Sequence, residues 1–331
     1  MERNRAKTSG FPGAEACVHC HLCRKHCGFL KKYQIDIGDT DKLRSLSYHC
    51  FLCGTCTGVC PKGIDGRQII LNMRRAHVAE SGKKPEGYRT LLWEKDPYKF
   101  RNYRKSSGKS VFFPGCNFPS FYPRTNAFLT RFLQEEAGIG VIYDCCGKPV
   151  AELGMEEREK ESIRELEKRL SREGVEELIV VCPNCYHFLK GRIGIRVVSI
   201  YQKLEELGTG KKSRWMKVNN KGVPIFLPCP DRREKEILED IKPFLEAEPL
   251  IRRDVQCCGL GGCGARKEPE IAAHMTDPLK NEELVYTYCA SCCGNLARKG
   301  IRVRHVLVEI LGNKEEPDTK KSLINRAKLI F

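Results

Sequence analysis

The sequence lacks the long apolar runs that mark membrane proteins and secreted precursors. Its 331 residues contain no window of 18 apolar residues, so we expect no transmembrane segment. The first twenty residues also lack the apolar core of a signal peptide. Aromatic residues make up only 8% and do not alternate with the lysine and arginine runs, which disfavours nucleic-acid binding. We expect a cytoplasmic protein, peripheral to the inner membrane only through a partner.

Cysteine, in contrast, is abundant, with 20 residues. The cysteines fall in clusters with two residues between members, unlike the irregular spacing of secreted disulfide scaffolds. Because cytoplasmic thiols stay reduced, this spacing favours metal ligands over disulfides. The net charge of +16 then has a use as counter-charge for negative metal–thiolate clusters, and any remaining basic patch is available to an acidic partner or substrate.

Residues 17–60 contain two runs with the spacing of bacterial two-cluster ferredoxins, Cys-x₂-Cys-x₂-Cys-x₃-Cys. In such proteins three cysteines bind one [4Fe–4S] cubane and the fourth binds the other. Zinc is the alternative, but zinc knuckles use pairs of cysteines. The helical periodicity of residues 67–77 favours an all-helical ferredoxin domain. The spacing assigns to the first cubane Cys17, Cys20, Cys23 and Cys60, and to the second Cys50, Cys53, Cys56 and Cys27.

The rest of the chain is an internal repeat. The segment 111–116 matches 224–229, and later cysteine motifs match with offsets that drift by only a few residues. Short β-branched runs end in cysteines, and segments with helical spacing, such as 156–172 and 231–245, lie between them. This alternation predicts two pseudo-symmetric α/β units of Rossmann-like type, each with a mainly parallel sheet. Ligands of such sheets bind beyond the carboxyl ends of the strands, where the cysteines lie.

The predicted organisation is therefore multidomain. It comprises a mainly α-helical two-cluster ferredoxin domain (1–82), a linker (83–109), a first repeat (110–215) and a second repeat (216–331). The basic stretch 101–109 within the linker is interpreted as a solvated surface, with docking of an acidic redox partner as the alternative.

Each repeat supplies one lone cysteine, an adjacent pair followed by glycine, and a Cys-x₂-Cys motif. This arrangement resembles the CCG domain of heterodisulfide reductase catalytic subunits and of iron–sulfur subunits in glycolate, lactate and anaerobic glycerol-3-phosphate dehydrogenases. The order of ferredoxin runs followed by two CCG repeats resembles the D subunit of heterodisulfide reductase. Carried over by position, the first set is Cys116, Cys145, Cys146, Cys182 and Cys185, and the second is Cys229, Cys257, Cys258, Cys289 and Cys292.

The resemblance implies that each five-cysteine set holds a noncubane [4Fe–4S] cluster with one iron open to substrate sulfur. Zinc or an ordinary [4Fe–4S] cluster in one repeat is the alternative. A disulfide between the two sets could give one sulfur to each cluster. Two cysteines remain, Cys263 and Cys293, which we interpret as buried thiols, although Cys293 could replace Cys292 as a ligand.

Electrons must come from another chain, because no flavin or nicotinamide fingerprint is present. The segment Gly259–Gly264 matches G-x-G-x-x-G, but it begins inside a cysteine motif, so its glycines are better explained by close approach to a cluster. The expected partner is a flavoprotein, a hydrogenase-type subunit or a membrane cytochrome. His187, two residues after Cys185, is the candidate proton donor for thiol release.

These observations predict an oxygen-sensitive iron–sulfur oxidoreductase subunit that reduces or forms a disulfide or heterodisulfide. The first alternative is an electron relay between a flavoprotein dehydrogenase of the glycolate, lactate or glycerol-3-phosphate type and a quinone or other carrier. The second is a zinc-stabilised scaffold. The five-cysteine completeness of both repeats favours the enzyme.

Overall fold

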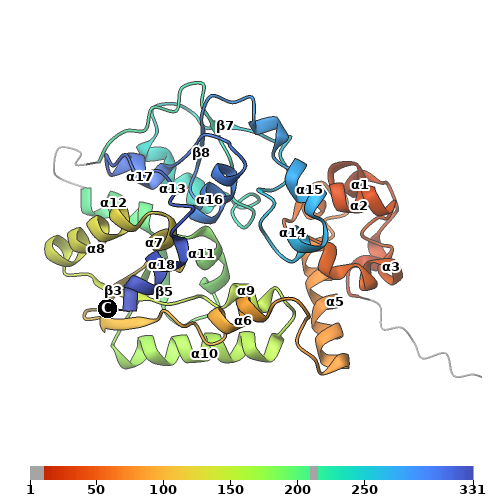
Figure 1. The fold of residues 1–331 in the computed structure, drawn as a ribbon, viewed down its shortest axis with the longest axis horizontal. Helices are drawn as coiled ribbons and strands as arrows, with labels where there is room; N and C mark the ends of the chain where they lie inside the picture. The colour runs from red at the N-terminus through yellow and green to blue at the C-terminus, as the bar shows by residue number, and fades with distance from the viewer. Residues whose placement is uncertain (1–10, 209–214, 331) are drawn as a thin grey trace, which may run out of the picture.

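A computed structural model describes residues 11–208 and 215–330. An N-terminal helical region, residues 11–81, lies on one side of a larger α/β body (Figure 1). Its elements are α1 (Leu22–His26), α2 (Gly28–Tyr33), α3 (Thr40–Ser45), α4 (Thr55–Gly58) and α5 (Gly66–Ser81), with 3₁₀ turns at Ala14–Ala16 and Ser47–His49. The helical periodicity of residues 67–77 is confirmed by α5.

Helix α5 has clear start and stop signals. The Asp65 side chain accepts a hydrogen bond from the Gln68 backbone at 3.0 Å, and Gly82 ends the helix with φ 61°. Its buried face carries Ile69, Ile70 and Met73, which belong to a core separate from that of the α/β body.

The first repeat forms a five-stranded mixed sheet in the order β1-β3-β2-β4-β5. Strands β2 to β5 run parallel, and β1 pairs antiparallel with β3 at the edge. The strands are β1 (Asn102–Lys105), β2 (Ser110–Phe113), β3 (Gly140–Tyr143), β4 (Glu177–Val180) and β5 (Arg196–Ser199). The helices are α7 (Phe118–Phe121), α8 (Pro123–Ala137), α9 (Lys148–Ala151), α10 (Glu156–Arg172), α11 (Pro183–Leu189) and α12 (Ile200–Gly208).

The second repeat forms a four-stranded parallel sheet in the order β7-β6-β8-β9, which matches β3-β2-β4-β5 strand for strand. The mainly parallel α/β prediction is thus confirmed for both halves. The strands are β6 (Pro224–Ile225), β7 (Leu250–Ile251), β8 (Val285–Thr287) and β9 (Val303–His305). The helices are α13 (Glu236–Ile241), α14 (Gly264–Lys267), α15 (Pro269–His274), α16 (Ala290–Arg298) and α17 (Val306–Ile310), with 3₁₀ turns at Lys242–Phe244 and Asp277–Leu279.

The two predicted repeat helices have different outcomes. Helix α10 covers 156–172 as expected, because its apolar residues recur on one face and Leu166 and Leu170 are buried. The expected helix over 231–245 begins only at Glu236. The Asp231 carboxylate accepts from the backbone N–H groups of Ile237 and Leu238, both at 3.1 Å, so residues 231–235 form a capping turn instead.

The segment 83–109, predicted as a linker, differs from that prediction. It contains α6 (Arg89–Lys95) and strand β1, and the Tyr103 hydroxyl donates to Asp144 at 2.7 Å. The sequence Asn-Tyr-Arg-Lys carries little strand signal, so only the pairing with β3 makes it a strand. Residues 102–105 of this segment are therefore part of the first sheet.

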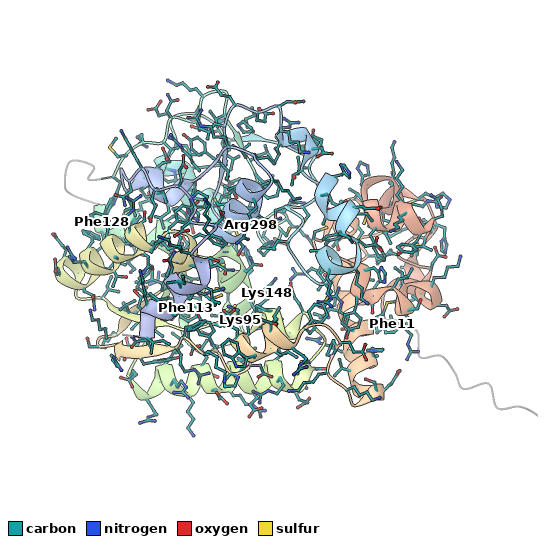
Figure 2. All side chains as sticks on the ribbon, in the orientation of Figure 1. Phe11, Lys95, Phe113, Phe128, Lys148 and Arg298 are labelled. Carbon is teal, nitrogen blue, oxygen red and sulfur yellow. The ribbon has the colours of Figure 1, made fainter. Side chains whose placement is uncertain are left out.

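The chain ends in α18 (Ser322–Ala327) and a 3₁₀ turn at Lys328–Ile330, which lie against the first repeat (Figure 1). Among the described residues, no helix combines the length and apolar character needed to cross a bilayer. In Figure 2, Phe128 of α8 lies at the edge of the molecule, whereas Lys95 of α6 lies near its middle.

Candidate iron–sulfur sites

Strand order brings the first five-cysteine set together. Strands β3, β2 and β4 are adjacent and parallel, so the residues that follow them meet at one edge of the sheet. Cys116 follows β2, the pair Cys145 and Cys146 follows β3, and Cys182 follows β4, with Cys185 in the first turn of α11. All five are buried.

The thiols of this set form a continuous chain of contacts. Cys116 is hydrogen-bonded to Cys145, and Cys145 to Cys146. Cys146 is hydrogen-bonded to Cys185, which in turn contacts Cys182. The structure thus brings together the five residues that the sequence grouped.

The second set repeats this arrangement at the matching sheet edge. The Cys257 sulfur lies 3.5 Å from the Cys229 sulfur and is hydrogen-bonded to Cys258. Cys258 contacts Cys292, and Cys292 contacts Cys289. Only Cys229 is partly exposed.

The two sets also touch each other. The thiols of Cys182 and Cys289 are hydrogen-bonded across the boundary between the repeats, and the Asn184 amide lies 3.8 Å from the Cys289 sulfur. The Asn117 amide donates to the Ser291 hydroxyl at 2.7 Å across the same boundary. The two sheet edges therefore face one another.

The N-terminal cysteines gather in two groups. One narrow cavity, walled also by Asp36, is lined by Cys17, Cys20, Cys23 and Cys60. In the other group, burial raises the pKa of Cys56, and the charges of Cys50, Cys27 and Cys53 raise it further. These four thiols therefore lie within range of one another's charges. The groups match the two sets that the ferredoxin spacing assigned.

The second N-terminal group is joined to the second repeat. The Cys53 thiol is hydrogen-bonded to Cys257. The Gln256 amide nitrogen lies 3.7 Å from the Cys27 sulfur and 3.6 Å from the Cys53 sulfur, and its oxygen accepts from the Gly28 backbone at 3.1 Å. The Gln256 side chain thus ties the helical region to the second repeat, directly before its CCG tripeptide.

In each set the electrostatics favour the thiolate form of particular cysteines. Hydrogen bonds from Cys145 and Cys185 lower the pKa of Cys146 to about 5. The corresponding bonds in the second set lower the pKa of Cys258 well below its usual value. Hydrogen bonds to Cys185 and Cys289 also lower the pKa of Cys182 well below its usual value. Since the thiolate is the form that binds metal, the first set contains two cysteines prepared to lose a proton and the second set contains one.

Backbone geometry around the thiols fits iron–sulfur ligation. The Leu52 N–H donates to the Cys50 sulfur at 3.3 Å, the kind of N–H to sulfur bond that tunes such clusters. Glycines allow close approach, since a Cβ on Gly115 would lie 3.1 Å from the Cys185 sulfur and one on Gly66 2.6 Å from the Cys56 sulfur. Larger side chains would crowd the thiols.

Buried cations near the sets were not found by sequence reasoning. Although burial lowers it, the charges of Cys116 and Cys145 raise the pKa of Lys95 in α6. In the same way, burial lowers the pKa of Arg232, but the charges of Cys229 and Cys53 raise it above its usual value. Lys95 is distant in sequence from its set and carried no signal, whereas Arg232 lies three residues after Cys229.

The remaining candidates are placed as follows. The Cys293 thiol lies near Tyr122 and outside the thiol chain that includes Cys292. Cys263 is buried in a small core against which Tyr88 packs. His187 Nε2 lies 2.7 Å from the Asp231 carboxylate, so its role as a proton donor stays a prediction.

The glycine motif at 259–264 packs against protein. A Cβ on Gly261, Gly262 or Gly264 would come within 2.6–3.1 Å of Phe51 or of the Cys50 backbone. These glycines therefore serve close approach to the cysteine-bearing helical region.

The profile of the CCG family, described as a cysteine-rich domain, matches residues 110–190 and 223–297. Those segments contain the two five-cysteine sets. They are two CCG domains. Each CCG domain therefore coincides with one parallel sheet and one thiol chain.

Similarity to curated proteins extends beyond the CCG domains. The chain is 24% identical over 326 residues to the B subunit of fumarate reductase (CoM/CoB) of Methanothermobacter marburgensis, covering 83% of this chain and 66% of that one. It is 22% identical over 309 residues to the D subunit of dihydromethanophenazine:CoB–CoM heterodisulfide reductase of Methanosarcina barkeri, covering 80% and 75%. An uncharacterized iron–sulfur protein of Methanococcus maripaludis is 24% identical over 260 residues, covering 68% and 50%.

The resemblance to the D subunit of heterodisulfide reductase is thus confirmed, and the relatives point to iron–sulfur clusters. The chain spans 66% of the length of the first of these relatives and 50% of the third. Among solved structures, a hypothetical protein from Helicobacter pylori matches with a TM-score of 0.53 at 10% identity, covering 86% of this chain and 66% of that one. That likeness concerns the fold alone.

Proposed function

We propose that this protein is an iron–sulfur oxidoreductase subunit of the heterodisulfide reductase type, with four four-iron clusters that serve thiol–disulfide chemistry. The observation that carries the proposal is the unbroken series of thiol contacts. It runs from the second N-terminal group through Cys53 and Cys257 into the second CCG set, and through Cys289 and Cys182 into the first.

In this proposal the eight N-terminal cysteines hold two [4Fe–4S] cubanes and each CCG set holds a noncubane cluster. Such clusters supply one-electron transfer and, at an open iron, a place for substrate sulfur. The chain's own residues fix the order of the sites. Gln256 holds the N-terminal group against the second set, and Asn184 and Asn117 hold the two sets against each other.

Reduction of a disulfide breaks one S–S bond, consumes two electrons and two protons, and releases two thiols. The electrons would enter through the N-terminal clusters from a separate subunit, for which a flavoprotein, a hydrogenase-type subunit or a membrane cytochrome are the candidates. The protons would come from water, with His187 as the proposed donor on the chain. Its Asp231 partner orients the imidazole.

The first test is the iron and zinc content of anaerobically isolated protein, combined with turnover. We expect about 16 iron atoms per chain and no zinc, from four four-iron clusters. Protein reduced by a low-potential dye should oxidise that dye when given a disulfide. Cys146→Ala or Cys258→Ala should remove about four iron atoms each and abolish turnover, since each deletes a thiol of its set whose pKa is lowered.

Cys292 and Cys293 offer a matched control. Both are buried neighbours in α16, but only Cys292 belongs to the thiol chain. Cys292→Ala should lose iron, whereas Cys293→Ala should retain it. About 8 iron atoms per chain, or full turnover in both Cys146→Ala and Cys258→Ala, would refute the proposed catalysis and favour an electron relay or a zinc scaffold.

A further inference from the structure

The segment 89–105 covers one side of the first CCG set. It contains α6 and β1, and within the described residues the second sheet has no strand in the place of β1. Tyr98 of this segment belongs to one small core with Cys116 and Cys145. Cys116 is 8% exposed, whereas Cys229, which follows the matching strand β6, is partly exposed. The cover at this position therefore differs between the two sets.

Lys95 and Tyr98 lie side by side within this segment. Their backbones form an antiparallel bridge, and the Lys95 ammonium lies 4.8 Å from the centre of the Tyr98 ring. Between them, the Asp96 carboxylate accepts from the Arg158 guanidinium of α10 at 2.9 Å, which fixes this turn to the first repeat. The Lys95 side chain is 9% exposed and lies near the middle of the molecule (Figure 2).

Both side chains carry buried polar groups that lack a hydrogen-bond partner. In the described part of the chain, the Tyr98 hydroxyl and the Lys95 ammonium make no hydrogen bond. The Lys95 ammonium lies 2.8 Å from one carboxylate oxygen of Glu94, as an ion pair, and Arg326 lies 3.1 Å from the same oxygen. One carboxylate thus faces two cations, so one positive charge is left over.

These groups lie beside the thiols of the first set. Burial raises the pKa of Tyr98, and the charges of Cys116 and Cys145 raise it further. Burial lowers the pKa of Lys95, but the same two cysteines raise it above its usual value. Because an unpaired buried donor destabilises a protein, we expect an acceptor at these thiols.

We propose that Lys95 and Tyr98 donate hydrogen bonds to sulfur at the Cys116 and Cys145 end of the first CCG set, and raise the reduction potential of the cluster held there. The inference rests on the proposed iron–sulfur content of that set. A positive charge and hydrogen bonds both favour the more negative, reduced state of a cluster. The first set, at the end of the series of thiol contacts, is thereby adapted to receive electrons.

Tyr98→Phe tests the hydroxyl, because it removes one oxygen atom and keeps the ring in its core. In electron paramagnetic resonance, the signal of the first set is the one that Cys146→Ala removes. At a fixed potential, the ratio of reduced to oxidised cluster should fall about fivefold in Tyr98→Phe, or about 40 mV for one electron. Tyr286→Phe is the control, since Tyr286 is equally buried but its hydroxyl donates to the Asn219 backbone at 3.3 Å.

Lys95→Met tests the charge. The same ratio should fall at least about tenfold, or about 59 mV for one electron, because a charge and a donor are lost together. Lys95→Arg should keep most of the potential, since it keeps the charge. Lys99→Met is the control, because it makes the same charge change at an exposed side chain four residues away.

Equal first-set potentials in the parent, Tyr98→Phe and Lys95→Met would overturn the inference. If Lys95→Met released iron, Tyr98→Phe would still decide, because it changes a single atom. A lowered potential in Tyr98→Phe, with no disulfide turnover by the parent, would support the inference and contradict the proposed function. Turnover with an unchanged first-set potential would contradict the inference and leave the function standing. A parent protein without any signal that depends on Cys146 would overturn both.

Discussion

At the scale of single residues, Gln256 joins the second repeat to the helical region. Its amide nitrogen faces the sulfurs of Cys27 and Cys53, its amide oxygen binds the Gly28 backbone, and its backbone oxygen accepts from Thr55 at 3.4 Å. Hydrogen bonds to cluster sulfurs stabilise the more negative, reduced state. We therefore expect Gln256 to act as a positioning residue and to raise the reduction potential of the cluster proposed at these cysteines.

Gln256→Leu should lower the midpoint potential of one N-terminal cluster. Losing about 1 kcal/mol of hydrogen bonding to the reduced state corresponds to about 40 mV for one electron. A redox titration followed by electron paramagnetic resonance measures this shift. Gln134→Leu is the control, because Gln134 lies on α8, at the opposite end of the molecule from α1 in Figure 1. An unchanged potential in Gln256→Leu would show that the amide acts only in packing.

At the scale of elements, the segment from Gly259 to Glu268 attaches the helical region to the second repeat. Gly261, Gly262 and Gly264 pack on Phe51, and α14 is followed directly by Glu268, whose carboxylate is fully buried. That carboxylate accepts from the Lys32 ammonium, the Tyr33 hydroxyl and the His49 ring, each at 2.6 Å. Three donors from the helical region thus converge on one acceptor of the second repeat.

Glu268→Gln should lower the free energy of unfolding by about 2 kcal/mol, because a neutral amide weakens the three charge-assisted hydrogen bonds that converge on this side chain. Glu270→Gln, an exposed change two residues away, should have little effect. Denaturant unfolding measures both. Burial raises the pKa of Glu268, but the hydrogen bonds lower it further, to below its usual value. The stabilisation that Glu268 contributes is therefore fully present at neutral pH. It is lost as the pH falls from the pKa of an ordinary carboxyl group through the lower pKa of Glu268 in the folded protein. Equal stability of the two variants would contradict this role.

At the scale of the whole molecule, the last residues cross back to the first repeat. The Asn325 amide donates to the Ser120 backbone at 3.0 Å, and the Ser120 hydroxyl donates to Ser322 at 2.8 Å. Farther along, Ala327 and Ile330 pack on the small core that contains Cys116 and Cys145. The C-terminal helix α18 therefore covers the first CCG set, although it follows the second in sequence.

Asn325→Ala should expose the first CCG set to oxygen. Cys116 and Cys145 would lose part of their cover, so iron should be released in air faster than from the parent, up to about four atoms per chain. The release is followed with an iron chelator. Leu323→Ala is the control, since Leu323 is on the same helix but half exposed. Identical release from both variants would contradict the covering role of α18.

The sequence predicts the local features well, because they depend on residues close together in the chain. Cysteine spacing grouped the sets that the structure brings together, and the repeat predicted two sheets of matching strand order. The apolar period of residues 156–172 predicted α10 to its bounds. In contrast, residues 231–235 were expected to be helical, but they form a turn in which Asp231 accepts from the Ile237 backbone and, from a distant part of the chain, the Tyr288 hydroxyl.

By itself, the sequence determined the α/β class of the two repeats and the five cysteines of each CCG domain, since spacing and periodicity are local properties. The tertiary structure alone decided that Cys53 meets Cys257, that Cys182 meets Cys289, and that Cys293 turns away toward Tyr122. The physical reason is that each of these contacts joins segments far apart in the chain, whose meeting depends on how whole sheets and helices pack.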